Sequence, residues 1–421
     1  MAQRVAFRFL FAYLALYLVL VRFLEADLAM QHEFGFAPGA GVLLSAYANW
    51  WAPIVAWVGH HVLRIGDPLV FQPGGNSDGL FGFVQLFCLV AIAAMAAAVW
   101  TLVGRRSEYR RLFRSLHVVT RYALAFSMLS YGMVKVLLVQ FHFPGLQELL
   151  VPLGDMPPFM MLGNFMGSSA VYTVFAGAGE VLAGLLLLHK RTATLGALVA
   201  LAIMTNVLML NVSYNWPEKL DALHMLLLAA VVMIPDAARL ANVLVLNRPT
   251  NPASPDARTR TRRERMTWIT IKAIVVAYML VSAPLVALNL QKVDPPPSVL
   301  RGIYHVDEFS LNGVVSPPST TNASRWETVI FDAADAFTFQ TMDHAWRTYR
   351  AEYEPREKQL TIFAGRATPS PSVLVVSAPV NEQLTLQGVF QSDTLLVQLS
   401  RVDESQFALL RGRFRWINGQ P

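Results

Sequence analysis

The segment AGAGEVLAGLLLLHKRTATLGAL, residues 176–198, is an apolar run that contains one acidic residue, Glu180, and then the basic pair Lys190-Arg191. An apolar stretch of about 20 residues is long enough to cross a bilayer. Glu180 is flanked by glycines and alanines, and such small residues let neighbouring helices approach closely. The segment therefore predicts a tightly packed pair of membrane helices with an acidic group between apolar surfaces.

Apolar runs long enough to cross a membrane recur along the chain. Of the 421 residues, 54% are hydrophobic and only 15% are charged, against about 25% charged in a typical soluble protein. Seven segments qualify as membrane spans: 7–24, 80–103, 116–139, 170–188, 193–212, 220–246 and 267–290. Arg4 precedes the first span and Arg8 lies at its beginning, and no small-residue cleavage site follows it, so we interpret it as a retained signal anchor.

Residues 41–63 are also apolar, but tryptophans and the pair His60-His61 interrupt them. Clustered tryptophans prefer the membrane interface. We therefore predict a helix that lies on the membrane surface or is half inserted.

The distribution of basic residues gives the orientation. Sixteen of them fall on one side of the predicted spans: Arg4, Arg8, Arg105, Arg106, Arg110, Arg111, Arg114, Lys190, Arg191, Arg239, Arg248, Arg258, Arg260, Arg262, Arg263 and Arg265. The opposite loops offer only Arg64 and Lys219. Loops rich in Lys and Arg stay in the cytoplasm. The pattern predicts a multi-pass protein of the plasma (inner) membrane with a cytoplasmic N-terminus and an extracytoplasmic C-terminal region.

The C-terminal region differs in charge and in period. Residues 302–421 contain 10 Lys and Arg against 13 Asp and Glu, whereas residues 1–301 contain 24 against 15. Short runs alternate apolar and polar residues: Trp326–Phe331, Phe337–Thr341, Gln359–Phe363, Val373–Ser377, Gln383–Gln387 and Leu395–Leu399. Such runs at regular spacing favour an antiparallel β-barrel or sandwich, and segments such as GIYHVDEF (302–309) and RGRFRWI (411–417) look lipocalin-like.

The predicted fold is thus mainly α, a transmembrane bundle of about seven spans followed by a β domain. Its predicted parts are an N-terminal membrane region (1–115), a four-helix membrane domain (116–246), a cytoplasmic Pro/Arg-rich linker (247–266), a seventh span (267–291) and the extracytoplasmic β domain (302–421). The linker is expected to lie on anionic lipid headgroups. No folded basic domain accompanies it, so we expect no nucleic-acid partner.

Several kinds of chemistry find no support in the sequence. The single cysteine, Cys88, lies in an apolar run, so no disulfide within the chain and no cysteine zinc site is possible. His305 and His344 in the β domain are interpreted as strand-surface residues. His117 and His189 fall at helix ends, but without further histidines we expect neither haem nor another metal.

Polar residues inside the predicted spans mark the candidate site, because such groups are costly in lipid and are often functional. Tyr131 and Lys135 lie four residues apart, on one helix face. Glu180, Asn206 and His224 follow in the next three spans. At about 1.5 Å per residue, Glu180 lies near the midplane and the others in the outer half. One polar cavity that opens outward would hold all five.

Two interpretations remain open. In the structural one, Lys135 and Glu180 form a buried ion pair that fixes helix packing. In the functional one, the cavity binds a polar headgroup such as a quinone or a lipid, Lys135 and His224 polarise its oxygen, and Glu180 relays protons.

Three segments carry a resemblance to a known family: RYALAFSMLSYGMVKV (121–136), residues 176–198 quoted above, and LHMLLLAAVVMIPD (223–236). They resemble the DoxX/DoxD superfamily of four-helix bacterial membrane proteins over roughly residues 115–240, and GGNSDGLFGFVQL (74–86) and the β-rich tail resemble its longer members. The resemblance implies electron transfer around quinone, in membrane complexes with redox partner proteins, and Lys135 and Glu180 match the recurring polar residues of the family. Because Cys88 is the sole thiol, thiosulfate oxidation by this chain alone is not expected.

The leading hypothesis is accordingly a quinone- or small-ligand-binding subunit of a membrane redox system. The alternative is a non-enzymatic scaffold, sensor or carrier whose β domain binds an apolar ligand or a partner protein. A transporter would be expected to show inverted repeats, and the sequence contains no convincing internal repeat.

Overall fold

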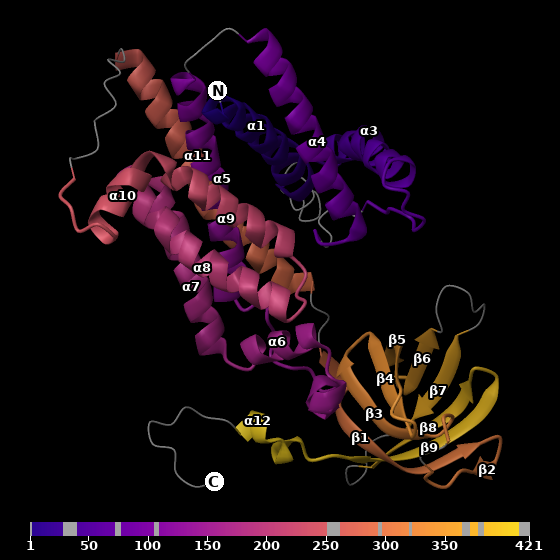
Figure 1. The fold of residues 1–421 in the computed structure, drawn as a ribbon. Coiled ribbons are helices and arrows are strands. Elements are labelled where there is room, and N and C mark those ends of the chain that lie inside the picture. Colours follow the sequence, from indigo (N-terminus) through magenta and orange to yellow (C-terminus); the bar gives the residue numbers. More distant parts are fainter. Residues whose placement is uncertain are drawn as a thin grey trace. The chain divides into compact units, whose positions relative to one another are not determined.

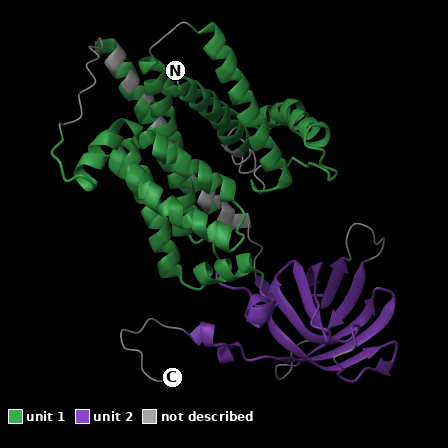
Figure 2. Cartoon of the chain, in the orientation of Figure 1, with its two compact units in different colours: residues 1–141, 157–291 green, residues 142–156, 292–421 purple. Residues whose placement is uncertain are grey.

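The computed structural model describes residues 2–27, 40–71, 77–104, 109–250, 262–293, 297–319, 322–363, 371–377 and 383–411. The chain forms two compact units (Figure 2). Unit 1 contains residues 1–141 and 157–291, and unit 2 contains residues 142–156 and 292–421. The loop 142–156 therefore belongs to the C-terminal unit, although it lies in the middle of the helical sequence.

Unit 1 is helical (Figure 1). Its helices are α1 (Ala2–Leu16), which continues into the π-helix η1 (Tyr17–Asp27), α3 (Ala40–His61), α4 (Leu80–Val103), α5 (Arg110–Val136), α6 (Pro158–Gly167), α7 (Ala170–Leu188), α8 (Ala193–Ser213), α9 (Lys219–Met233), η4 (Ile234–Asp236), α10 (Ala237–Leu244) and α11 (Arg262–Val293).

Four helices pack in a closed ring, because α5 contacts α7 and α9, and α8 contacts both α7 and α9. Glycines set the closest approach, between α5 and α7. A Cβ added to Gly177 would lie 2.7 Å from the Gly132 carbonyl oxygen and 2.7 Å from Lys135 Cβ. This four-helix ring corresponds to the predicted segment 116–246. It packs α7, the helix that contains Glu180, against α5.

Helices α1 and α4 run antiparallel and contact each other along their length (Figure 1). At one end the Arg8 guanidinium donates to the Tyr109 hydroxyl (2.6 Å) and, at 3.4 Å, to the Gly104 carbonyl. At the other end Gln85 Nε2 donates to the Glu25 carboxylate (2.8 Å). The chain therefore leaves α1 and enters α4 at the same end of this pair.

Helix α3 crosses the beginning of α4. The Tyr47 hydroxyl accepts a hydrogen bond from Gln85 Nε2 (2.8 Å), whereas a Cβ added to Gly59 would lie 3.5 Å from a methyl group of Val84. The two contacting positions of α3 are twelve residues apart, about 18 Å along the helix at 1.5 Å per residue, yet they contact two consecutive residues of α4. The contacts favour a helix that lies across α4.

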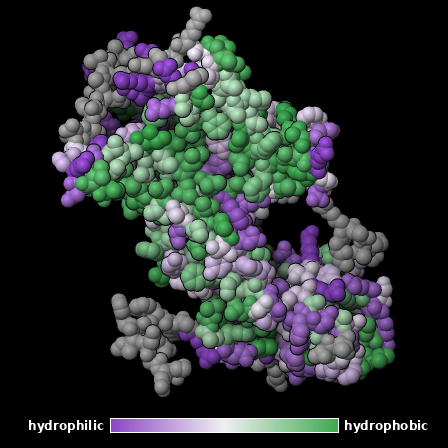
Figure 3. Space-filling view, in the orientation of Figure 1, coloured by the Kyte–Doolittle hydropathy of each residue, from purple (hydrophilic) through white to green (hydrophobic). Residues whose placement is uncertain are grey.

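Six helices are long and apolar enough to cross a membrane, among the described residues: Ala2–Glu25, Ala40–His61, Leu80–Val103, Ala170–Leu188, Ala193–Ser213 and Lys219–Leu244. Figure 3 shows a mainly hydrophobic surface over unit 1. The six include α3, which we expected at the interface, and omit α5 and α11, which we expected to span. Helix α5 carries buried polar groups such as Thr120, Arg121 and Ser127, which neighbouring helices shelter.

Unit 2 contains an antiparallel β-barrel. Its strands are β1 (Pro297–Leu311), β2 (Val314–Val315), β3 (Trp326–Ala333), β4 (Ala336–Thr341), β5 (Trp346–Glu354), β6 (Gln359–Phe363), β7 (Ser372–Val376), β8 (Gln383–Phe390) and β9 (Asp393–Arg401). They follow sequence order from β3 to β9, and β9 pairs with β1, so eight strands close the barrel while β2 pairs only with β1. We predicted an antiparallel barrel or sandwich, and the structure has the barrel.

The barrel interior is filled by the chain's own side chains. Leu384, Leu386 and their neighbours alternate inward, and Trp326 stacks on Phe339 with ring centroids 4.2 Å apart. Twenty buried residues form this cluster. Aromatic rings of this size bury large apolar areas, which allows a domain without disulfides to be stable.

A second, smaller cluster attaches the loop 142–156 to the barrel exterior. This loop contains the 3₁₀ turns η2 (Glu148–Leu150) and η3 (Leu153–Asp155). Leu146 is 2% exposed and packs against Ile303 and Ile330, and its backbone N–H donates to the Asp332 carboxylate (3.0 Å). After β9 the chain forms η5 (Glu404–Gln406) and α12 (Ala408–Arg411).

Some predictions concern single residues or segments outside the described residues. His305 is exposed on β1, as expected, whereas His344 is exposed in a turn rather than on a strand. Most of the linker (251–261) and residues 412–417 of RGRFRWI lie outside the described residues.

Candidate functional site

A cavity of about 610 Å³ lies within unit 1, between α5, α6, α7, α8 and α9. Most of its lining is apolar, for example Leu162, Met166, Phe175 and Met225. Four of the five predicted site residues line it: Tyr131, Lys135, Glu180 and Asn206. Its volume falls within the range of small-molecule sites, about 300–1,000 Å³.

The ion pair at the inner wall joins α5 to α7. Lys135 Nζ lies 3.0 Å from Glu180 Oε2, and the two side chains are 9% and 1% exposed. Lys135 Nζ also donates to the Tyr131 carbonyl oxygen (3.4 Å) and lies 5.7 Å from the centre of the Tyr131 ring. Because the glycine contact between Gly132 and Gly177 lies directly beside this pair, the backbone packing and the ion pair support each other.

The cavity reaches the bundle surface beside α7 and α8. Phe175 on α7 is 73% exposed and Leu182 is 52% exposed, and Asn206 on α8 is also exposed. All three also line the cavity. An apolar molecule in a membrane could therefore enter between these helices without crossing water.

The polar end of the cavity contains residues that the sequence interpretation did not single out. These are Glu218, Gln140 and Trp216. Asn211 and Asp221, polar residues of the predicted fifth and sixth spans, line this end as well. Asn211 Nδ2 donates to the Glu218 carbonyl oxygen (3.2 Å), and Glu218 has a left-handed backbone (φ 95°) directly before α9.

Glu218 is half-buried and has an unusual acidity. Burial and, to a smaller extent, the neighbouring charge of Asp221 together raise the pKa of Glu218 to about 7, against the opposing charge of Lys135. A side chain with this pKa can take up or release a proton near neutral pH. Glu218 was missed because it lies in the loop before the predicted span, where a carboxylate looks like an ordinary solvated residue.

His224 does not line this cavity, which corrects the prediction that all five residues share one site. Its Nδ1 donates to the Leu220 carbonyl oxygen (2.6 Å), so Nε2 of the neutral ring accepts a hydrogen bond from the Tyr13 hydroxyl (2.7 Å). Tyr17 stacks on the same ring, with centroids 4.0 Å apart. Both nitrogens are thus engaged between α1 and α9, and His224 lines a second cavity instead.

The remaining candidate ligands are occupied by structural contacts. His117 Nε2 donates to the Val232 carbonyl oxygen (3.0 Å), and His189 Nδ1 accepts the Arg191 backbone N–H (3.3 Å). Cys88 is buried and free. Among the residues whose placement is described, no group of three His, Cys, Asp or Glu side chains is arranged to hold a metal ion.

Fold and cavity together define a class: a helical membrane protein with a ligand-sized cavity in its bundle and a C-terminal β-barrel unit. The chain is 35% identical over 124 residues to the uncharacterized protein YwoB of Bacillus subtilis (strain 168), an alignment that covers 27% of this chain and 73% of YwoB. The chain therefore belongs to the same family as YwoB. No sequence model of a protein family and no solved structure matches it.

Proposed function

We propose that the cavity beside Lys135 and Glu180 binds the headgroup of a quinone, and that the protein is a DoxX-like subunit of a membrane redox system. The observation that carries this proposal is a mainly apolar cavity of about 610 Å³ with a few converging polar groups at one end. Such a distribution suits an amphipathic molecule, because the apolar part fills the volume and the polar groups fix its orientation.

Each polar residue then has a distinct task. Lys135 donates a hydrogen bond to a quinone oxygen while Glu180 holds its ammonium group in place. Glu218 accepts a proton that a bound quinol would release, since its pKa of about 7 matches the working pH. The electrons would pass to a separate redox protein in the membrane.

Entry from the lipid phase supports a lipophilic ligand over a soluble one. The exposed lining residues Phe175 and Leu182 lie on the flank of the bundle, where acyl chains would surround them. A quinone carries its apolar tail in the bilayer and could remain there while its headgroup occupies the cavity.

The test is quinone retention by the purified full-length protein. Solvent extracts of the wild type, analysed by liquid chromatography, should contain quinone in roughly equimolar amount. The double variant Lys135→Met/Glu180→Leu, which leaves no unpaired charge, should lose it, whereas Lys190→Met, at an exposed lysine, should not. Wild-type extracts without quinone would contradict the proposal.

We also propose seven spans, formed by α1, α4, α5, α7, α8, α9 with α10, and α11. The contacts of α1 with α4 favour this count, because α3 begins and ends on the same side of that pair. The C-terminal ends of α5 and α11 both lead directly into unit 2, as expected if both helices end outside the cytoplasm.

Topology reporters test this arrangement. Alkaline phosphatase fused after Pro421 should be active, and the same enzyme fused after Thr250, in the predicted cytoplasmic linker, should be inactive. Activity at both sites or only after Thr250 would exclude seven spans with a cytoplasmic N-terminus.

A non-enzymatic scaffold or sensor is the second candidate. The closed barrel with strands in sequence order supports a lipocalin-like unit. Its filled interior argues against an apolar ligand inside and favours a partner protein on its outer surface. Under this alternative, a pull-down with the intact protein should retain a stoichiometric partner while its solvent extracts contain no quinone, whereas the leading proposal requires quinone in the extracts.

A further inference from the structure

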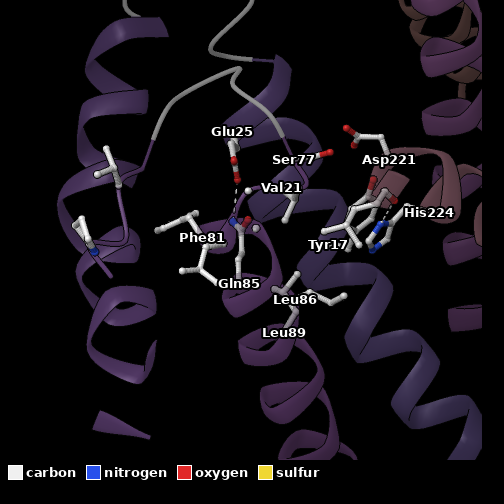
Figure 4. Close-up of a pocket in the computed structure, with 16 residues that line it drawn as sticks. Tyr17, Val21, Glu25, Ser77, Phe81, Gln85, Leu86, Leu89, Asp221 and His224 are labelled. Atoms are coloured by element: carbon white, nitrogen blue, oxygen red, sulfur yellow. Dashed lines mark hydrogen bonds between the residues drawn. The ribbon is translucent and has the colours of Figure 1, made fainter. Parts of the chain in front are cut away.

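A second cavity, of about 340 Å³, lies in unit 1 between η1, the beginning of α4, the segment that precedes α4, and α9 (Figure 4). It is separate from the proposed quinone cavity, and the two share one lining residue, Asp221. The volume is at the lower end of the range for small-ligand sites.

Two carboxylates line this cavity. Glu25 accepts hydrogen bonds from Gln85 (2.8 Å) and from the Tyr47 hydroxyl (3.1 Å), both at the same oxygen, Oε2. Asp221 accepts no hydrogen bond and forms no ion pair with any residue whose placement the structure describes. Figure 4 shows the two carboxylates at separate points of the wall, with Val21 and Ser77 between them.

The described lining residues include neither Lys nor Arg, and the nearby ammonium group of Lys219 pairs with Asp78 at 3.3 Å. His224 also lines the cavity, but its two nitrogens are held by Leu220 and Tyr13. A ligand that brings a positive charge would therefore gain favourable interactions with both acids.

The rest of the wall suits an organic cation better than a bare metal ion. Tyr17 and Phe81 contribute aromatic rings, and Tyr17 is fixed by its stack on His224 (4.0 Å between centroids, 5° between planes). Aromatic faces attract ammonium groups. Two carboxylates supply fewer ligands than a metal site needs, and leucines line much of the remaining space.

We propose that this second cavity binds a primary ammonium group, with Asp221 and Glu25 as its carboxylate partners. The chemistry has two possible sources, a small amine from the aqueous phase or the ethanolamine headgroup of a phospholipid. Both acids lie at the predicted outer ends of their helices, where either source has access. The proposal does not depend on quinone in the first cavity.

The experiment uses the full-length protein in phosphatidylcholine nanodiscs, titrated with 2-phenylethylammonium by calorimetry. Saturable binding is expected, and 2-phenylethanol, the neutral molecule of the same shape, should bind at least about tenfold more weakly because it lacks the charge. Asp221→Asn and Glu25→Gln should each weaken amine binding by a similar factor. The control Asp67→Asn, at an exposed acid, should leave it unchanged.

Nanodiscs that contain phosphatidylethanolamine distinguish the two sources. If the lipid headgroup is the ligand, this lipid should suppress binding of the amine and should remain bound to the wild type, but not to Asp221→Asn, in native mass spectrometry. If a soluble amine is the ligand, amine binding should be the same in both lipids.

Equal affinity of the wild type for the amine and the alcohol would overturn the proposal. Unchanged amine binding in a doubly substituted Asp221→Asn/Glu25→Gln protein would also overturn it. The comparison of the two probes on the wild type remains decisive even if the variants fail to fold.

Discussion

Removal of one partner of the ion pair between Lys135 and Glu180 should strongly destabilise unit 1. In Lys135→Met the Glu180 carboxylate, whose side chain is 1% exposed, would lose the ammonium group that lies 3.0 Å away. Breaking a buried pair in this way costs about 3–5 kcal/mol, because the remaining charge is neither solvated nor compensated. Glu180→Leu should cost a similar amount, since it leaves the ammonium group of Lys135 buried.

The double variant Lys135→Met/Glu180→Leu should behave differently. It replaces both charges with apolar side chains of comparable size, a change that is about neutral or stabilising by up to roughly 4 kcal/mol in other buried pairs. The two single effects would therefore fail to add by several kcal/mol, which is the signature of direct coupling in a double-mutant cycle.

The measurement is the free energy of unfolding in mixed detergent micelles, followed by tryptophan fluorescence at neutral pH. Lys190→Met serves as the matched control and should change the free energy by less than about 0.5 kcal/mol, because Lys190 is exposed. A loss below about 1 kcal/mol in Lys135→Met, or a double variant as unstable as the sum of the single ones, would refute the reasoning.

Three other predictions follow from the packing and from one titrating group. Gly177→Ala should cost about 1–3 kcal/mol, since its Cβ would overlap α5, whereas Gly154→Ala, with open space around it, should be tolerated in the same unfolding assay. Phe337→Ala should cost about 3–5 kcal/mol of unit 2 stability by calorimetry because Phe337 is fully buried, and His305→Ala, on the exposed face of β1, should cost almost nothing; equal costs would contradict the filled interior. The raised pKa of Glu218 means that its protonated form favours the folded state, so stability that is fully present below pH ~4.5 should decrease as the pH rises through about 7. Glu218→Gln should flatten the stability profile across this window, and an unchanged slope would place the titration elsewhere.

In the barrel, the alternation of apolar and polar residues was enough to predict most of the strands. All six runs of alternating residues that we identified are strands, because a strand places successive side chains on opposite faces and one face here is buried. The strands Pro297–Leu311 and Trp346–Glu354 extend this pattern. Periodicity gave no sign that residues 142–156 belong to the same unit, since Leu146 packs there through contacts with residues more than 150 positions away.

For the helices of unit 1, hydropathy located the elements but did not predict their surroundings. Apolar runs located the helices, but hydropathy alone places α3 among the helices that could cross the membrane, although its contacts run across α4. Polarity was also ambiguous for α5, where buried Arg121 and Ser127 lower the hydropathy of a helix at the centre of the bundle. Whether a polar group meets lipid or protein depends on its neighbours, and these are set by packing.

Hydropathy and periodicity were enough to predict the two-part organisation and the positions of most helices, because apolar and alternating runs reflect burial directly. They predicted the contact of Lys135 with Glu180 only as one of two interpretations, and the packing of α5 against α7 brings the two side chains to 3.0 Å. Only the tertiary structure decided which polar residues share a cavity. His224 and Asn206 both looked like members of one site, yet His224 is turned toward Tyr13 and lines a different cavity from Asn206. Glu218 and Glu25 became candidates only once their surroundings were known, because the packing of each helix against its neighbours determines which side chains face a cavity.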